Sequence, residues 1–412
     1  MEKATKIDHL VVMTAVAITV VFFTAYAPAA DIYVNSTDDE HNGNCIFECT
    51  LRDAILVSNA NGEYDRIYVP AGHYNLTIPN AGSHSGETGD LLIDSPEWVE
   101  IIGEGPGVTV VDGNGIDRVF RINPGSGNVQ LRGMTIQGGD APGSGGGVFN
   151  VDSTLLIHDC HIVHNHASSA GFDGGGVFNG SGNLHLVDCL VAYNSCEGDG
   201  GGVYLGTGSF GLITKSTIYS NEAVRGGAAF TSGTSQFVNA TVFGNSADDN
   251  VAGLSNIGSA TLYHSTFVQG AGPDDISISS TALMSEVILV NSVIFGACDV
   301  YERTVDAQQG NIEFGDTCHM GYGNYANAGV AGIGMDGFGY YGGGVPTVKL
   351  LNSSWAIDNQ WTTTFLQDRD ARFVTRPQGT YGDSGAFELV PGEIFIHGFE
   401  NGYTAGWGDD LL

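Results

Sequence analysis

A nine-residue block that recurs seven times constrains the fold of this chain more than any other feature of its sequence. The copies span 131–139, 157–165, 186–194, 213–221, 237–245, 262–270 and 289–297. The first and last copies end 158 residues apart, at Gly139 and Ala297, so the mean period is about 26 residues. A repeat of this length indicates stacked structural units, each of which buries its core against its neighbours.

Side-chain alternation within the block indicates strands. Small residues such as Cys160 and Cys189 hold the fourth position, and Ile, Val or Phe holds the sixth. Two inward positions separated by one residue give the period of a strand rather than of a helix. The intervening fifth position is expected to face solvent, and four copies place threonine there: Thr135, Thr217, Thr241 and Thr266.

Glycine runs precede four of the blocks, at 145–147, 174–176, 200–202 and 226–227, and each leads into a short apolar segment. Glycine allows the sharp turns that join such strands. Short strands, sharp turns and this period predict an all-β chain that forms a single-stranded right-handed parallel β-helix, a pectin-lyase-like solenoid. A leucine-rich horseshoe would need a denser leucine pattern, and a propeller blade needs about 40 residues.

The last residue of four consecutive blocks is asparagine. In a solenoid, equal positions of successive coils stack about 4.8 Å apart. We therefore expect a structural ladder of amide hydrogen bonds, with a ligand-binding row as the less favoured alternative, along Asn165, Asn194, Asn221 and Asn245.

The first 29 residues resemble a secretory signal peptide. Basic Lys3 and Lys6 precede an uncharged apolar run over 10–25, and Ala27 and Ala29 suit cleavage after Ala29. An uncleaved anchor is the alternative, but the run is shorter than the ~20 residues a spanning helix needs. We expect export to the cell surface or medium, and no transmembrane segment in the mature chain.

The net charge argues against one class of partner. The chain carries 14 Lys and Arg against 46 Asp and Glu, a formal charge of −32. Because phosphate contacts require a basic patch, nucleic acid is excluded as an expected partner.

The sequence over 49–61, CTLRDAILVSNAN, resembles the Cys-Ser-Leu-Arg-Glu-Ala motif of exported bacterial β-helix proteins, with Thr50 and Asp53 replacing Ser and Glu. Its spacing predicts a helix that covers the open end of the first coil. The repeats are similar to those of the polymorphic outer-membrane protein family, although the 115 residues after Ala297 are too few for that family's translocator barrel. The resemblance implies an exported, surface-located protein of a Gram-negative bacterium.

Resemblance to segments of known families also predicts the boundaries of the C-terminal region. Segments 356–358, 368–376 and 383–388 resemble the stretch that closes the solenoid in the first family, without the Cys often found there, and 394–402 with Trp407 is similar to a short C-terminal tag of secreted proteins. The expected organisation is a signal peptide (1–29), a first strand and capping helix (30–64), β-helix coils (65–297), last coils and C-terminal cap (298–390), and a tail (391–412).

Seven cysteines in an exported chain predict disulfides. Cys45 with Cys49 and Cys298 with Cys318 lie at cap or loop ends and are expected to pair, whereas Cys196 is expected to be unpaired. Cys160 and Cys189 should stack in successive coils, where a bond and two buried thiols are nearly equal alternatives.

The sequence matches the residue patterns of known catalytic and metal-binding sites poorly. Asp159 and Asp188 share the third block position and are the weak catalytic candidates, since a glycoside hydrolase needs two nearby carboxylates. The third position also lies beside a bend, where Asp is an ordinary turn residue. His158, His161, His164 and His166 lack a completing ligand for a metal, so we expect no cofactor. Acidic pairs at 38–39, 248–249 and 274–275 leave only a weak indication of calcium.

We therefore expect a non-catalytic extracellular protein of adhesin type that binds a glycan or protein through a long face of the solenoid. The alternative is a polysaccharide lyase or glycoside hydrolase. A lyase acting on uronates needs a basic residue, and only Lys215 and Arg225 are basic between 143 and 297.

Overall fold

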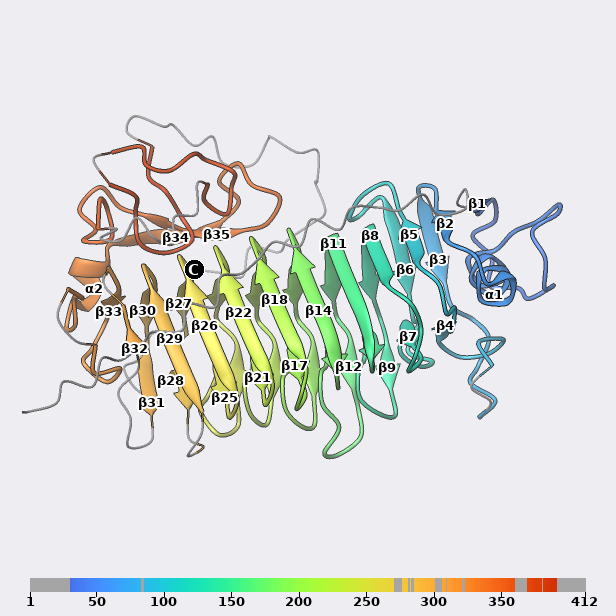
Figure 1. The fold of residues 1–412 in the computed structure, drawn as a ribbon, viewed down its shortest axis with the longest axis horizontal. Coiled ribbons are helices and arrows are strands. Elements are labelled where there is room, and N and C mark those ends of the chain that lie inside the picture. The colour runs from blue at the N-terminus through green and yellow to red at the C-terminus, as the bar shows by residue number, and fades with distance from the viewer. Residues whose placement is uncertain are drawn as a thin grey trace, which may run out of the picture.

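The computed structural model describes residues 30–82, 85–269, 276–280, 282, 285–300, 306–308, 310–320, 323–359, 369–379 and 381–390. It confirms the predicted fold: an all-β, right-handed parallel β-helix whose coils stack along one axis (Figure 1). The expected signal peptide (1–29) and the tail (391–412) lie outside the described residues. Among the described residues, no helix has the length and apolar character needed to cross a membrane.

The largest sheet contains two parallel stacks of strands. We call the first stack the leading strands: β1 (Ala30–Tyr33), β2 (Asp65–Tyr68), β5 (Val99–Ile102), β8 (Val129–Gln137), β11 (Ser153–Val163), β14 (Gly182–Val187), β18 (Phe210–Thr214), β22 (Thr234–Val238), β26 (Ser259–Tyr263), β29 (Glu286–Val290) and β32 (Asp306–Ala307). The trailing strands are β3 (Gly72–Asn75), β6 (Thr109–Asp112), β15 (Leu190–Ala192), β19 (Thr217–Tyr219), β23 (Thr241–Phe243), β27 (Thr266–Val268), β30 (Val293–Phe295) and β33 (Ile312–Glu313), together with the second halves of β8 and β11.

Two smaller parallel sheets complete each coil. One contains β4 (Leu91–Ile93), β7 (Phe120–Ile122), β10 (Val148–Asn150), β13 (Val177–Asn179), β17 (Val203–Leu205), β21 (Ala229–Thr231), β25 (Leu254–Asn256), β28 (Ile276–Ser280) and β31 (Ala297–Val300). The other contains β9 (Asp140–Ala141), β12 (His166–Ala167), β16 (Ser195–Cys196), β20 (Glu222–Ala223) and β24 (Ser246–Ala247). The inward side chains of the two larger sheets form one continuous core, whereas Ala167, Cys196 and Ala223 of the smallest sheet form a separate small cluster.

The corner between leading and trailing strands explains the third position of the repeat. One residue per coil turns the chain there with a φ of 46–53°, and this corner row comprises Asp159, Asp188, Lys215, Asn239, His264 and Asn291. Asp and Asn tolerate this left-handed conformation better than most residues. The left-handed backbone conformation therefore explains why Asp and Asn are frequent in the corner row.

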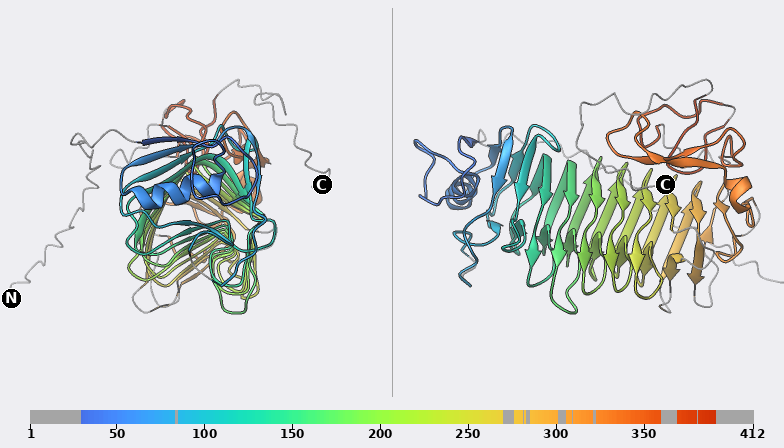
Figure 2. Two further views of the ribbon diagram at one scale, coloured as in Figure 1. Left: turned by 90° about the vertical axis from the view of Figure 1, so that its right-hand side faces the viewer. Right: turned by 180° about the vertical axis from the view of Figure 1, so that it is seen from behind.

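Helix α1 (Leu51–Asn61) covers the N-terminal end of the solenoid, as predicted from the 49–61 motif (Figure 2). Thr50 caps it by accepting a hydrogen bond from Asp53 N, and Gly62 ends it with a φ of 67°. Leu51, Ala54 and Ile55 are buried against the first coil. The helix thus shields apolar core and strand edge from water.

The C-terminal region covers both the end of the solenoid and one of its sides. Helix α2 (Gly329–Ile333) lies at the end of the solenoid, but the chain then turns back along its side (Figure 1). We call the described residues 335–359, 369–379 and 381–390 the C-terminal lobe, which contains the antiparallel hairpin of β34 (Met335–Gly339) and β35 (Thr347–Leu350). The lobe packs on the trailing strands of the later coils.

The lobe overturns the prediction of a solvent-facing threonine column. Thr217 donates to Pro346 O, Thr241 hydrogen-bonds Thr347 at 2.8 Å, and Thr266 accepts from Ala386 N at 2.9 Å. These three threonines are at most 3% exposed, and Thr135 is buried where it accepts from Gly107 N. The threonine column therefore packs against segments that are distant in the sequence, and no local sequence pattern reveals such contacts.

Candidate functional site

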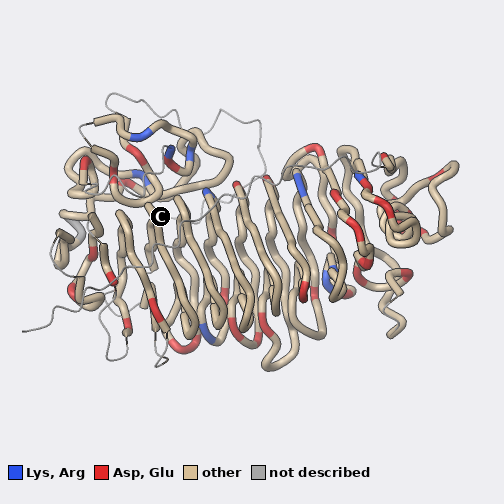
Figure 3. Tube along the Cα trace, in the orientation of Figure 1, with Lys and Arg blue, Asp and Glu red and all other residues tan. Residues whose placement is uncertain are grey.

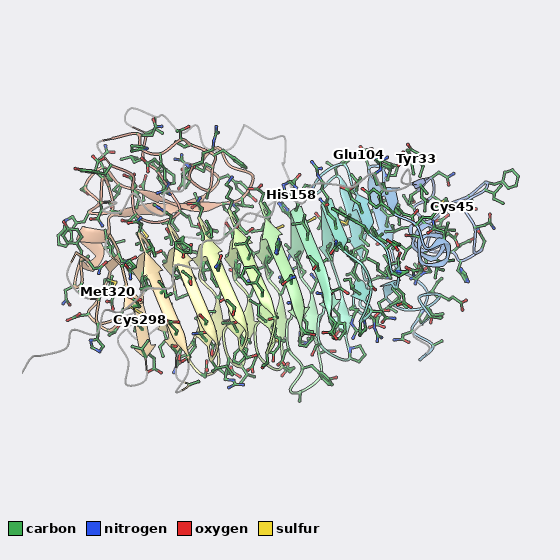
Figure 4. The ribbon with its side chains drawn as sticks, viewed as in Figure 1. Tyr33, Cys45, Glu104, His158, Cys298 and Met320 are labelled. Atoms are coloured by element: carbon green, nitrogen blue, oxygen red, sulfur yellow. A yellow bond between two sulfur atoms is a disulfide. The ribbon has the colours of Figure 1, made fainter. Side chains whose placement is uncertain are left out.

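The two carboxylates singled out from the sequence stand next to each other on the corner row. Asp159 is exposed and Asp188 is half-buried one coil further on. The Nε2 atom of His158, from the preceding position of β11, lies 3.6 Å from Asp188 Oδ2. Figure 4 places His158 between the loop that carries Glu104 and the C-terminal lobe. The structure therefore brings together Asp159, Asp188 and His158.

Burial and charge act in opposite directions on Asp188. Burial raises the pKa of the Asp188 carboxyl above its ordinary value, whereas the neighbouring Lys215 and His158 lower it. Lys215 is itself held by the lobe, because its Nζ lies 3.9 Å from the centre of the Phe373 ring. A carboxyl with a raised pKa beside a second carboxylate is a pattern that acid–base catalysis uses.

Beyond Lys215, the corner row serves as the docking line of the lobe. Asn239 Nδ2 donates to Arg369 O at 2.8 Å, and His264 Nδ1 lies 2.9 Å from Arg376 Nη1. The Asp159–Asp188 pair is thus the part of the row that these lobe contacts leave accessible.

The four histidines at 158–166 do not form a metal site. His158 contacts Asp188 on the corner, whereas His164 stacks on Tyr193 with ring centroids 5.0 Å apart. His166 Nδ1 is 2.8 Å from Ser195 Oγ. Burial lowers the pKa of His161 to about 4. His158 and His161 lie in β11, His164 turns the chain with a φ of 56°, and His166 lies in β12, so proximity in sequence is misleading here.

The acidic pairs considered as calcium ligands contain residues with other partners, or lie outside the described residues. Asp39 binds the buried Arg52 guanidinium at 2.7 Å, and residues 274–275 lie outside the described residues. Asp249 Oδ1 accepts from Val251 N at 2.9 Å within its own loop.

The outward side of the leading strands is a second candidate surface. We call the outward side chains of β11, β14, β18, β22 and β26 the front face: Thr154, Leu156, His158, Asn183, His185, Val187, Phe210, Leu212, Thr214, Thr234, Gln236, Val238, Ser259, Thr261 and Tyr263. Most of them are partly exposed. None is Asp, Glu, Lys or Arg, and Figure 3 shows that most charged residues of these coils gather at the corners and turns, as Asp159 does within β11.

The four asparagines of the last block position stack in one buried column. Asn165, Asn194 and Asn221 each donate from Nδ2 to the Oδ1 of the next asparagine at 3.0 Å. Each Oδ1 also accepts the backbone N–H of the preceding asparagine, and Gln269 Oε1 extends the column past Asn245. These amides are occupied by the protein and offer little to a ligand.

The cysteines divide into bonded and free residues. Cys45–Cys49 and Cys298–Cys318 are disulfides, whereas Cys160, Cys189 and Cys196 are buried thiols. Burial raises the pKa of Cys160 to about 12 and of Cys196 to about 11. Thiols held protonated in this way are poor nucleophiles and poor metal ligands.

Sequence reasoning missed two buried ionic clusters. Arg52 of the 49–61 motif is 1% exposed, pairs with Asp39, and donates to the carbonyls of Gly86 and Gly89. In the lobe, Arg376 lies 3.7 Å from Glu388 and donates to Gly385 O at 2.7 Å. The resemblance of 49–61 and 383–388 to known motifs was the available signal, but it did not reveal the partners.

Comparisons with known proteins agree with the architecture. The profile of the family described as the right handed beta helix region matches residues 105–269, which contain most of the repeats. No curated protein and no solved structure matches the chain. The matched region and the fold together show a right-handed parallel β-helix protein.

Proposed function

We propose that this chain is an exported protein that binds an extended, uncharged glycan along the front face and catalyses no reaction on it. The observation that carries the proposal is the absence of charged residues from the front face in a chain of net charge −32. Contiguous partly apolar surface on a soluble protein commonly marks an interaction site. An uncharged polymer is the partner that such a surface accepts at the lowest desolvation cost.

The protonation state of the face supports a neutral ligand. His185 lies at its centre, between Leu156 and Leu212 of the adjacent coils. Burial lowers the pKa of His185, which favours the uncharged imidazole. Hydroxyl, amide and imidazole groups alternate with Leu, Val and aromatic side chains over five coils, which provides both hydrogen bonds and apolar contact for sugar rings.

Two carboxylates beside the front face disfavour polyanions. Asp159 and Asp188 border the front face along the corner, and Lys215 is engaged with Phe373 and Asp188. A polyuronate would meet repulsion from these carboxylates. Export, suggested by the N-terminal segment and by the resemblance of 49–61, is part of the proposal.

A binding assay tests the proposal directly. The purified chain is expected to bind insoluble neutral polysaccharides in pull-downs, and to be retarded by soluble neutral glycans but not by polyuronates in affinity electrophoresis. Leu212→Asp and Thr214→Asp place a charge in the front face and should each weaken binding by about tenfold or more, the equivalent of about 1.4 kcal/mol. Val224→Asp changes an exposed residue outside the front face and should bind normally. Preference for a polyuronate, or equal loss in Val224→Asp, would contradict the proposal.

A glycoside hydrolase is the second candidate, favoured by the Asp159–Asp188 pair and the raised pKa of Asp188. A screen for new reducing ends and unsaturated uronates, with and without Ca²⁺, distinguishes the two functions. Turnover that Asp159→Asn or Asp188→Asn abolishes would establish catalysis and overturn the non-catalytic proposal.

A further inference from the structure

We propose that Cys298, Cys318 and Glu313 form a two-state site: a disulfide in the oxidised protein, and a thiolate–carboxylate site for Zn²⁺ once a dithiol has reduced that disulfide. This site is independent of the front face and of the glycan proposal. It lies at the C-terminal end of the solenoid, where Figure 4 labels Cys298 and Met320.

Two segments of the chain bring the ligand atoms together. Cys298 belongs to β31, Glu313 ends β33, and Cys318 follows five residues later. The two Sγ atoms and a carboxylate oxygen of Glu313 all lie within 4.8 Å of one another, and all three residues are buried. Two thiolates and a carboxylate are ligands that zinc accepts.

Glu313 is the observation that points to a cation. Its Oε1 accepts hydrogen bonds from Thr317 N at 2.7 Å, Thr317 Oγ1 at 2.8 Å and Cys318 N at 2.9 Å, which fix the carboxylate. Its Oε2 is buried and has no hydrogen-bond partner, and the side chain is 0% exposed. Among the described residues no ion pair neutralises it. A buried carboxylate oxygen without a partner is costly, and a metal ion would satisfy it.

The two states interconvert by balanced chemistry. In the oxidised state neither sulfur can bind a metal. A dithiol supplies two electrons and two protons to the Cys298–Cys318 bond and becomes a disulfide itself, which leaves two thiols in the protein. Zn²⁺ then displaces both thiol protons to solvent, takes two sulfur ligands and one Glu313 oxygen, and keeps water in its fourth position.

The chain contains its own control for this chemistry. The Cys45–Cys49 disulfide has no third His, Cys, Asp or Glu atom within the same distance among the described residues. Reduction of that bond should therefore create a pair of thiols without a zinc site.

Metal titration of the reduced full-length chain tests the proposal. After treatment with a dithiol and removal of the reductant, one Zn²⁺ is expected to bind per chain, and Co²⁺ should give thiolate-to-cobalt charge-transfer absorption. Cys45→Ser/Cys49→Ser should keep this binding and Cys298→Ser/Cys318→Ser should lose it. Glu313→Gln should weaken it by about tenfold or more. Circular dichroism at each step checks that the β-structure persists.

Several outcomes would overturn the site. Undiminished zinc affinity in Glu313→Gln would remove the carboxylate from the ligand set, and binding that survives in Cys298→Ser/Cys318→Ser would place the metal elsewhere. Loss of β-structure on reduction that Zn²⁺ does not restore would show that no zinc site remains without the disulfide.

Discussion

Each asparagine of the buried column satisfies backbone groups of two neighbouring coils. Asn194 Oδ1 accepts from both Asn165 N and Asn165 Nδ2 at 3.0 Å, and its Nδ2 donates to Ile162 O at 2.9 Å. Asn194→Ala leaves these buried groups without partners and should lower the free energy of unfolding by about 3 kcal/mol. Denaturant titration measures this. The exposed Asn183→Ala on β14 is the control and should stay within about 0.5 kcal/mol of wild type.

Arg52 connects the capping helix to two distant loops. Its guanidinium is 1% exposed, pairs with Asp39, and donates to Gly86 O and Gly89 O. Arg52→Met leaves the Asp39 charge buried without its cation, so we expect a loss of about 3–5 kcal/mol of unfolding free energy. Thermal or denaturant unfolding measures the loss.

Arg66→Met provides the matched control, because its partner Asp31 is about one-third exposed and water screens the pair. That change should cost about 1 kcal/mol or less. Equal losses for Arg52→Met and Arg66→Met would show that burial does not decide the effect.

At the scale of elements, the short strands after the glycine runs create a row of stacked rings. Strand register aligns Phe149, Phe178, Tyr204 and Phe230, with centroids 4.9–5.4 Å apart and planes within 7°. The guanidinium of Arg118 lies 5.4 Å from the Phe149 ring, and that of Arg225 lies 5.0 Å from the Phe230 ring. Each end of the row therefore meets a cation, which strengthens the stack.

Phe178→Ala removes a ring from the middle of the row and with it two stacking contacts. The lost contacts and lost burial should together destabilise the protein by about 2–3 kcal/mol. Phe172→Ala, at an exposed residue of the loop that precedes β13, should change stability by less than about 0.5 kcal/mol. Similar unfolding midpoints for the two variants would contradict the structural role of the row.

The elements that could be predicted from the sequence are those that follow local rules. The repeat predicted the stacked coils, the inward side chains at positions four and six predicted the strands, and the spacing over 49–61 predicted α1. The lobe could not be placed in this way, because its contacts, such as Asn239 with Arg369 and Thr241 with Thr347, join residues more than 100 positions apart without periodicity. For the same reason, the sequence placed Asp159 and Asp188 in adjacent coils but gave no indication of Phe373 over Lys215.

At the scale of the whole molecule, the buried charges of the lobe make its attachment depend on pH. Burial and the nearby Glu388 raise the pKa of Asp383 from 3.8 to about 7. The folded protein therefore holds this proton more tightly than the unfolded chain does. The corresponding stability is fully present below about pH 4 and is lost as the pH rises through about 7.

Asp383→Asn should flatten this dependence, because the neutral amide no longer exchanges the proton. In wild type, the free energy of unfolding should fall between pH 4 and pH 7 with a contribution from Asp383 of at most about 1.4 kcal/mol per pH unit. Glu388 also has a raised pKa, so the variant should keep part of the slope. Urea unfolding at pH 4, 5, 6 and 7 measures the difference between the two slopes. Asp336→Asn, which removes an exposed carboxylate paired with Lys349 in the same lobe, should leave the slope unchanged. A wild-type slope in Asp383→Asn would show that the Asp383 carboxyl does not hold its proton in the folded protein.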